Sequence, residues 1–215
     1  MIEYYAHSEN KLGEKEPLID HLRKTAFLTE KYAQAFGEKN AGAWLGWFHD
    51  IGKASLLFQN VLKGIEHNVN HAAAGAFFLR QYRLLSRVIY AHHDGLQWFI
   101  RSDLDRSLQI VNSQDSFEGK RFSISGQQQY QTLIEYIRSL KDFPLEKLTD
   151  NPPLLQRERE SFYANLSEMM HARMLLSCLC DADYTATASH EDASFFTNVE
   201  DKSVDADLLL NGILD

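Results

Sequence analysis

Apolar and small residues recur at helical spacing along most of the chain. Between residues 18 and 36 they occupy positions 18, 22, 26, 29, 33 and 36, which predicts an amphipathic helix that ends at Gly37. The same spacing predicts further helices over residues 41–50, 55–62, 72–85, 84–94, 127–140 and 158–187. Residues 121–124 instead alternate between polar and apolar, close to turn signals, and we interpret them as part of a small hairpin insertion. The pattern therefore predicts an all-α helical bundle with almost no strand.

Length and composition fit one domain with a buried core. The chain has 215 residues, of which 44% are hydrophobic. Its first 30 residues do not resemble a signal peptide, and no apolar run approaches the roughly 18 residues of a membrane span. Cys178 and Cys180, two positions apart in a helical pattern, point to different sides, and we read them as buried thiols in a reducing compartment. These features indicate a cytoplasmic protein that does not bind a membrane.

The negative charge of the chain is concentrated near its end. The net charge is −8, and residues 189–215 contain seven acidic residues and one basic residue, which leaves −2 for residues 1–188. This balance is unusual for a nucleic-acid-binding protein, because Lys and Arg supply most of the non-specific affinity for phosphates. Bound divalent ions would reverse the sign locally, so the composition does not exclude a phosphate-bearing substrate.

Nine histidines stand out in the composition. The apolar segment 44–48 runs directly into His49 and Asp50, and Gly52 and Lys53 follow at once. Imidazole and carboxylate are both good ligands for divalent transition ions, and a carboxylate has two oxygens with which to bridge two ions. The alternative is a helix that happens to end in polar residues or, for His21, a core histidine. The candidate ligands, all on predicted helices or at their ends, are His21, His49, Asp50, His71, His92, His93 and Asp183.

The last predicted helix carries two neighbouring aspartates. Asp183 continues the row Ala172, Leu176 and Leu179, which faces the core, whereas Asp181 continues a less apolar row. A carboxylate in line with core leucines is costly unless it is paired or bound to a metal; the alternative is simple solvation of an acidic pair. We therefore favour Asp183 as the ligand and place Asp181 in the shell around the ligands.

This set of residues resembles the HD superfamily of metal-dependent phosphohydrolases. More closely, the chain from residue 5 to residue 187 is similar to the HD nuclease domain of the CRISPR-associated type I helicase-nuclease. The pair His92-His93 downstream of His71 is its most specific feature, because the basic one-metal HD pattern lacks it. The other supporting motifs are Tyr5-Ala6-His7-Ser8, Phe48-His49-Asp50-Ile51-Gly52-Lys53-Ala54-Ser55, His71-Ala72-Ala73-Ala74-Gly75 and Asp181-Ala182-Asp183.

The resemblance implies an HD-domain bundle with a centre of two divalent transition ions. It assigns the ligands to two groups that share Asp50 as a bridge: His21, His49 and Asp183 with one ion, and His71, His92 and His93 with the other. Mixed imidazole–carboxylate ligation suits iron, manganese, cobalt or nickel better than magnesium. Lys53 is not an expected ligand. As a compact cation it would hold the scissile phosphate or stabilise developing negative charge, with a solvated surface lysine as the alternative.

The implied activity is endonucleolytic cleavage of single-stranded DNA by two-metal phosphodiester hydrolysis in CRISPR interference, an antiviral defence. The implied partners are single-stranded DNA, a helicase motor domain or subunit, and an RNA-guided surveillance complex. Residues 1–188 would form the HD nuclease domain, and the acidic tail, residues 189–215, would link to or dock on the helicase or form a partly disordered end. Two alternatives stay open: an HD phosphohydrolase acting on nucleotides or cyclic nucleotides, and a catalytically silent interaction module.

Overall fold

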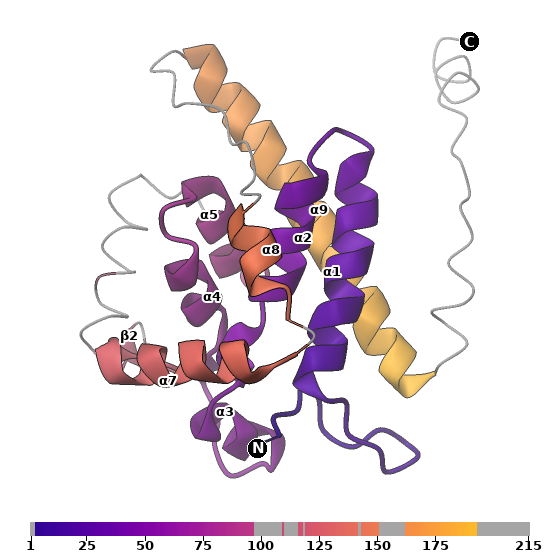
Figure 1. The fold of residues 1–215 in the computed structure, drawn as a ribbon, viewed down its shortest axis with the longest axis vertical. Coiled ribbons are helices and arrows are strands. Elements are labelled where there is room, and N and C mark those ends of the chain that lie inside the picture. The colour runs from indigo at the N-terminus through magenta and orange to yellow at the C-terminus, as the bar shows by residue number, and fades with distance from the viewer. Residues whose placement is uncertain are drawn as a thin grey trace.

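The computed structural model describes residues 3–96, 109, 116–117, 119–141, 143–150 and 162–192, which form a mostly helical bundle (Figure 1). The elements in chain order are α1 (Leu18–Gln34), α2 (Lys39–Phe48), η1 (Ile51–Lys53), α3 (Leu56–Leu62), β1 (Val69–Asn70), α4 (Ala72–Phe78), α5 (Arg83–Ala91), β2 (Ser116–Phe117), β3 (Lys120–Phe122), α7 (Gly126–Ser139), α8 (Leu145–Asp150) and α9 (Phe162–Glu191). None of these helices is both long and apolar enough to cross a bilayer. The predicted helical fold class is confirmed.

Helix α1 packs against α2 and α9, and α9 also contacts α5. The helical spacing of apolar residues explains this packing, because Leu22 and Ala26 of α1 and Leu175 and Leu179 of α9 are all buried. Burying one leucine side chain stabilises the fold by roughly 1.5–3 kcal/mol. The first turns of α9 extend past the rest of the bundle, where Met170 is exposed (Figure 1). The other end of α9 is therefore the part that can contribute side chains to the interior.

Two glycines allow helices to approach closely around the end of α2. A Cβ atom on Gly46 of α2 would overlap the backbone of Ala26 in α1, and one on Gly75 of α4 would overlap the carbonyl oxygen of Phe48. A residue without a Cβ atom is needed where backbones approach this closely. These contacts hold the C-terminal end of α2 against α1 and α4, directly before the two candidate ligands that follow α2.

The short strands form one sheet in the order β1–β3–β2. β2 and β3 pair antiparallel, as the predicted hairpin requires. β1 pairs parallel with β3, with Val69 opposite Arg121 and Asn70 opposite Phe122. A strand of two residues is too short to show alternation in the sequence. Because His71 follows β1, this pairing fixes the backbone directly before a candidate ligand.

The helix predicted over residues 72–85 is interrupted in the structure. α4 ends at Phe78 and α5 begins at Arg83, so the break between the two helices predicted over residues 72–85 and 84–94 lies earlier than expected. The turn between them folds α5 back onto α4, and Ser86 donates a hydrogen bond of 2.7 Å to the carbonyl oxygen of Ala76. Leu79 in the turn is itself buried, so the apolar pattern continues across the break and conceals it.

Some expectations fall partly outside the described residues. Residues 151–161 and 193–215 are not among them, so the start of the helix predicted over residues 158–187 and most of the acidic tail stay predictions. The cysteines are described. Cys178 and Cys180 are free and only half-buried, so the expectation of fully buried thiols is corrected.

Candidate metal centre

Asp50 lies at the centre of the candidate site, between His49 at the end of α2 and the start of η1, and is fully buried. Its Oδ1 atom is 3.0 Å from Nε2 of His71 and 3.5 Å from Nε2 of His92. Its Oδ2 atom is 3.3 Å from Nε2 of both His21 and His49. Each carboxylate oxygen therefore faces a different set of imidazoles.

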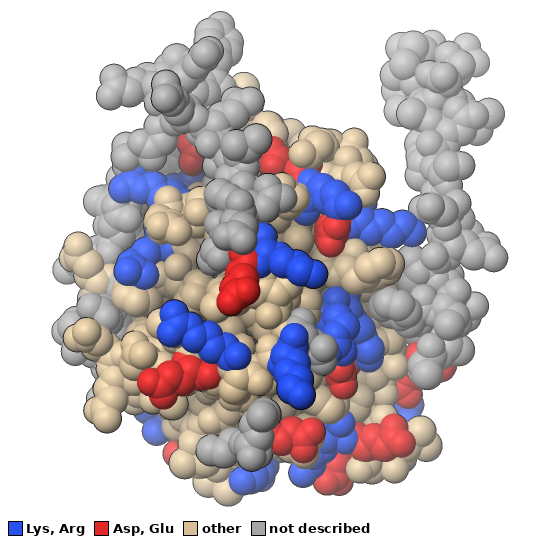
Figure 2. Space-filling model, in the orientation of Figure 1, with Lys and Arg blue, Asp and Glu red and all other residues tan. Residues whose placement is uncertain are grey.

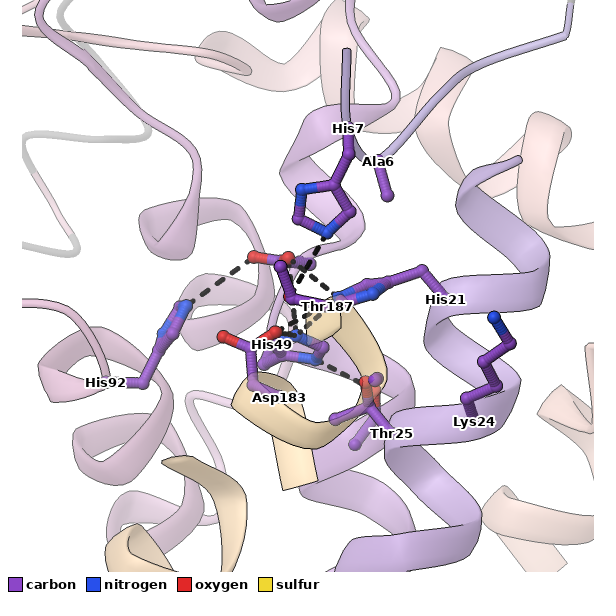
Figure 3. A network of polar contacts seen from close by, with 12 residues as sticks. Ala6, His7, His21, Lys24, Thr25, His49, His92, Asp183 and Thr187 are labelled. Atoms are coloured by element: carbon purple, nitrogen blue, oxygen red, sulfur yellow. Dashed lines mark hydrogen bonds and ion pairs between the residues drawn. The ribbon is translucent and has the colours of Figure 1, made fainter. Parts of the chain in front are cut away.

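The first set, here called the His21 group, consists of His21, His49, Asp50 and Asp183. Its side chains come from α1, from the residues after α2 and from α9, and Figure 3 shows His21, His49 and Asp183 converging. Oδ1 of Asp183 is 3.2 Å from Nε2 of His21 and 3.6 Å from Nε2 of His49. Three segments far apart in the sequence thus supply one cluster of potential ligand atoms.

The second set, here called the His71 group, consists of Asp50, His71, His92 and His93. Nε2 of His71 is 2.7 Å from Nε2 of His93. Neighbouring residues in a continuous helix point about 100° apart, but α5 ends at Ala91, and both His92 and His93 lie in the turn that follows. The end of the helix therefore allows both rings to face the same group.

Backbone carbonyls orient two of the rings. Nδ1 of His49 donates to the carbonyl oxygen of Gly46 at 2.9 Å, and Nδ1 of His92 donates to that of Ile89 at 2.6 Å. Because a carbonyl can only accept, each Nδ1 carries the hydrogen and each neutral ring presents the lone pair of Nε2 to the centre. Hydrogen bonds of this kind commonly orient metal-binding histidines.

The spacing of the donor atoms fits divalent ions. Within each group, all ligand atoms lie within 4.8 Å of one another. Ligand atoms about 2.1 Å from one shared ion stand roughly 3–3.5 Å apart, which is the range of most of these contacts. Both oxygens of Asp50 and Nε2 of His92 are buried without a well-directed hydrogen bond from a described residue. Buried polar atoms normally have partners, and bound ions would supply them here.

The electrostatics of these residues also favour bound cations. Burial would lower the pKa of His21, but its close contacts with the carboxylates of Asp183, Asp50 and Glu16 outweigh burial and raise the pKa to about 10. Burial is likewise outweighed at His49, where the charge of Asp50 helps to raise the pKa to about 9. Burial would raise the pKa of Asp50, yet the charges of His49 and Lys53 hold it well below its usual range. Protons and Lys53 thus balance the carboxylates, and metal ions would displace such protons on binding.

Lys53 is part of this centre. It ends η1 and is only 5% exposed, so the alternative of a solvated surface lysine is wrong. Its Nζ atom is 2.7 Å from Oδ2 of Asp50 and donates at 3.2 Å to the carbonyl oxygen of Ala6. The ammonium group is therefore held beside Asp50 by the N-terminal arm.

The two aspartates of α9 differ as expected in their access to the site. Asp183 faces the His21 group with a side chain that is 20% exposed, whereas Asp181 is exposed. Two residues along a helix correspond to a rotation of about 200°, which explains the contrast. The interpretation of Asp181 as a neighbour of the ligands is therefore corrected. The buried row on α9 also differs slightly from the expected one, since Leu175 is fully buried and Leu176 only half-buried.

Two residues that the ligand pattern did not include also reach the site. Glu16 is buried, with Oε2 3.3 Å from Nδ1 of His21, and Nε2 of His7 is 3.7 Å from the same oxygen. Both belong to an N-terminal arm that has no helical period. His7 is visible only as part of the Tyr5-Ala6-His7-Ser8 motif, and no local signal distinguishes Glu16 from the exposed acidic residues nearby.

Gly52 holds η1 against the backbone of His71. A Cβ atom at position 52 would overlap the carbonyl oxygen of His71. We therefore expect Gly52→Ala to displace His71 and to lower the affinity of the His71 group for Mn²⁺ by roughly 10–100-fold, with a smaller effect on the affinity of the His21 group. Calorimetric titration of the metal-free protein with Mn²⁺ measures this, with the change Leu56→Ala at an exposed nearby side chain as the control. Unchanged Mn²⁺ affinity in Gly52→Ala would show that this contact does not position His71.

Comparison with known families agrees with the geometry. Residues 18–120 match the family model described as HD domain. No curated protein matches the chain. The matched range contains Lys53 and every candidate ligand except Asp183, which α9 brings to the same centre. The match and the geometry together support an HD domain of the metal-dependent phosphohydrolase superfamily, with buried His/Asp groups as its candidate metal sites.

Proposed function

We propose that this HD domain is an endonuclease that cleaves single-stranded DNA by two-metal phosphodiester hydrolysis, and that it acts in CRISPR interference. The observation that supports it best is Asp50, whose two oxygens face the His21 group and the His71 group separately. A carboxylate in this position is suited to bridge two ions. The choice of DNA rests on the His92-His93 pair and the other motifs that resemble type I CRISPR nucleases.

Divalent transition ions, when bound, would supply Lewis-acid activation of water and of the phosphate. We assign one ion to the His21 group and the other to the His71 group, with iron, manganese, cobalt or nickel as the candidates. The rings of His49 and His92 are fixed by their backbone hydrogen bonds, so they would hold the ions without reorienting. This prior orientation is what allows a site to stabilise charge at the moment of reaction.

Lys53 would act directly on the phosphate. An ammonium group has three donors, and two of those of Lys53 have partners in Asp50 and in the carbonyl oxygen of Ala6. In our proposal the third donates to a phosphate oxygen and stabilises the negative charge that develops there. The burial of Lys53 strengthens such a contact, because water competes poorly for a buried donor.

A polymeric substrate suits the accessible side of the centre. Among the described residues, His93 is exposed and Asp183 is partly exposed, so both groups have a member near the surface. The face seen in Figure 2 has Lys and Arg side chains interspersed with Asp and Glu side chains. Such a surface binds DNA weakly by itself. We therefore propose that a helicase motor and an RNA-guided surveillance complex deliver the strand.

A circular single-stranded DNA tests this proposal, because a circle has no end for an exonuclease. We expect Mn²⁺-loaded protein to linearise and fragment the circle and to leave a fully paired circle nearly intact. Asp50→Ala protein, prepared in the same way, controls for contaminating nucleases. An intact circle together with hydrolysis of free or cyclic nucleotides would replace the nuclease with a nucleotide phosphohydrolase. Metal binding without hydrolysis of any of these substrates would favour a silent interaction module.

A further inference from the structure

We propose that Glu16 is a positioning residue of the metal centre: its carboxylate accepts the Nδ1–H of His21 and thereby holds Nε2 of that ring toward Asp50 and Asp183. The proposal rests on metal binding by the His21 group, as proposed above. It adds a residue that lies outside both the seven candidate ligands and the matched range of residues 18–120.

The His21 ring lies between carboxylates. Behind it, Oε2 of Glu16 is 3.3 Å from Nδ1; both of these atoms are buried, and neither has a well-directed hydrogen bond with a described residue. In front of it, Nε2 is 3.3 Å from Oδ2 of Asp50 and 3.2 Å from Oδ1 of Asp183. An ionised carboxylate only accepts hydrogen bonds, so in our proposal the Nδ1–H turns toward Glu16 when Nε2 binds an ion.

Glu16 does for His21 what the backbone does for two other rings. His49 and His92 donate Nδ1–H to carbonyl oxygens of their own helices. His21 lies in the first turn of α1, and its Nδ1 faces a side-chain carboxylate instead, at 3.3 Å. A side chain can be removed by mutation whereas a carbonyl cannot, so this orienting contact can be tested directly.

The Glu16 carboxylate is itself held in place. The backbone carbonyl of Glu16 accepts a hydrogen bond of 2.9 Å from the amide of Ala6 in the N-terminal arm. Its Oε1 atom accepts one of 2.8 Å from Nζ of Lys24, which also donates to Oγ of Ser189 on α9 at 3.3 Å. A residue whose backbone and buried carboxylate are both held in place loses little entropy when it orients a ligand. Figure 3 shows Lys24 and His21 on the same helix and His7 approaching from the N-terminal arm.

Metal-free protein titrated with Co²⁺ tests the proposal, by calorimetry and by the visible absorption of the bound ion. The variants at the site are Glu16→Ala, Glu16→Gln, His21→Ala and the double variant that combines Glu16→Ala with His21→Ala. The control is Glu14→Gln, at an exposed residue of the same segment. We expect Glu16→Ala to lower the affinity for one Co²⁺ ion by roughly 10–100-fold and to leave the affinity for the other unchanged. Glu16→Gln should lose less, because its amide oxygen still accepts the Nδ1–H.

The double variant separates a positioning role from general support of the fold. If Glu16 acts through His21, then Glu16→Ala adds no loss of affinity to His21→Ala. The proposal would be overturned if Glu16→Ala lowered the affinity for both Co²⁺ ions equally or left it unchanged. It would also be overturned if the losses of affinity in the two single variants added up in the double variant. Loss of a third Co²⁺ equivalent would overturn it too, in favour of an ion between His7, Glu16 and His21. If the wild type binds no Co²⁺, the proposed function fails as well.

Discussion

Replacing Asp50 by alanine is expected to abolish metal-dependent hydrolysis, with a loss of at least about 1,000-fold in kcat. Asp50 contributes an oxygen to each ligand group, so its removal should lower the affinity of both groups for metal ions. No other described residue belongs to both of these groups. Single-turnover cleavage of labelled single-stranded DNA at saturating Mn²⁺ measures the loss.

Asp50→Asn controls for stability in this experiment. Alanine would leave the buried ammonium group of Lys53 without its partner, which costs about 3–5 kcal/mol when a buried ion pair loses one member. Asparagine also removes the negative charge, but it keeps the volume and one oxygen that can accept from Lys53, so it should destabilise the fold less than alanine and still lose most of the activity. Thermal unfolding of both variants shows whether the fold is intact. Wild-type cleavage by a folded Asp50→Asn protein would contradict the central position of this carboxylate.

Asp183→Ala is expected to have the next largest effect, a loss of roughly 100–1,000-fold in hydrolysis. Asp183 is the carboxylate that α9 contributes to the His21 group, 3.2 Å from Nε2 of His21. Its loss should release one ion and spare the ion of the His71 group. The rate of cleavage and the metal content after dialysis measure the two effects separately.

Asp181→Ala is the matched control for that prediction, because Asp181 has the same charge, lies on the same helix and is exposed. Exposed substitutions away from special features usually change stability by less than about 0.5 kcal/mol. We therefore expect nearly wild-type activity and metal content. If the two alanine variants lose activity equally, α9 contributes general negative charge and Asp183 is not a specific ligand.

Much of the candidate site was predictable because it follows from local patterns. The apolar period of α1 and the apolar segment before His49 predict two packed helices, and the row Ala172, Leu176 and Leu179 sets Asp183 apart from Asp181. The structure brings all seven candidate ligands into two groups that share Asp50. Their role as ligands stays a prediction until ions are measured.

The features that could not be predicted depend on contacts between distant segments. The parallel pairing of β1 with β3 joins residues about fifty positions apart, and β1 has only two residues. Glu16 becomes part of the site because its backbone pairs with Ala6, which no helical or strand period marks. The turn between α4 and α5 is hidden because the buried Leu79 continues the apolar pattern. In each case tertiary packing decides the outcome, and local sequence carries no trace of it.

The metal content of the wild-type protein tests the central claim most directly. Protein stripped of metal and reloaded anaerobically with iron, manganese, cobalt or nickel should contain close to two ions per chain by elemental analysis, one for each ligand group. Asp50→Asn protein treated identically should contain fewer. A content of one ion or less per wild-type chain, together with full hydrolytic activity, would contradict the dinuclear centre.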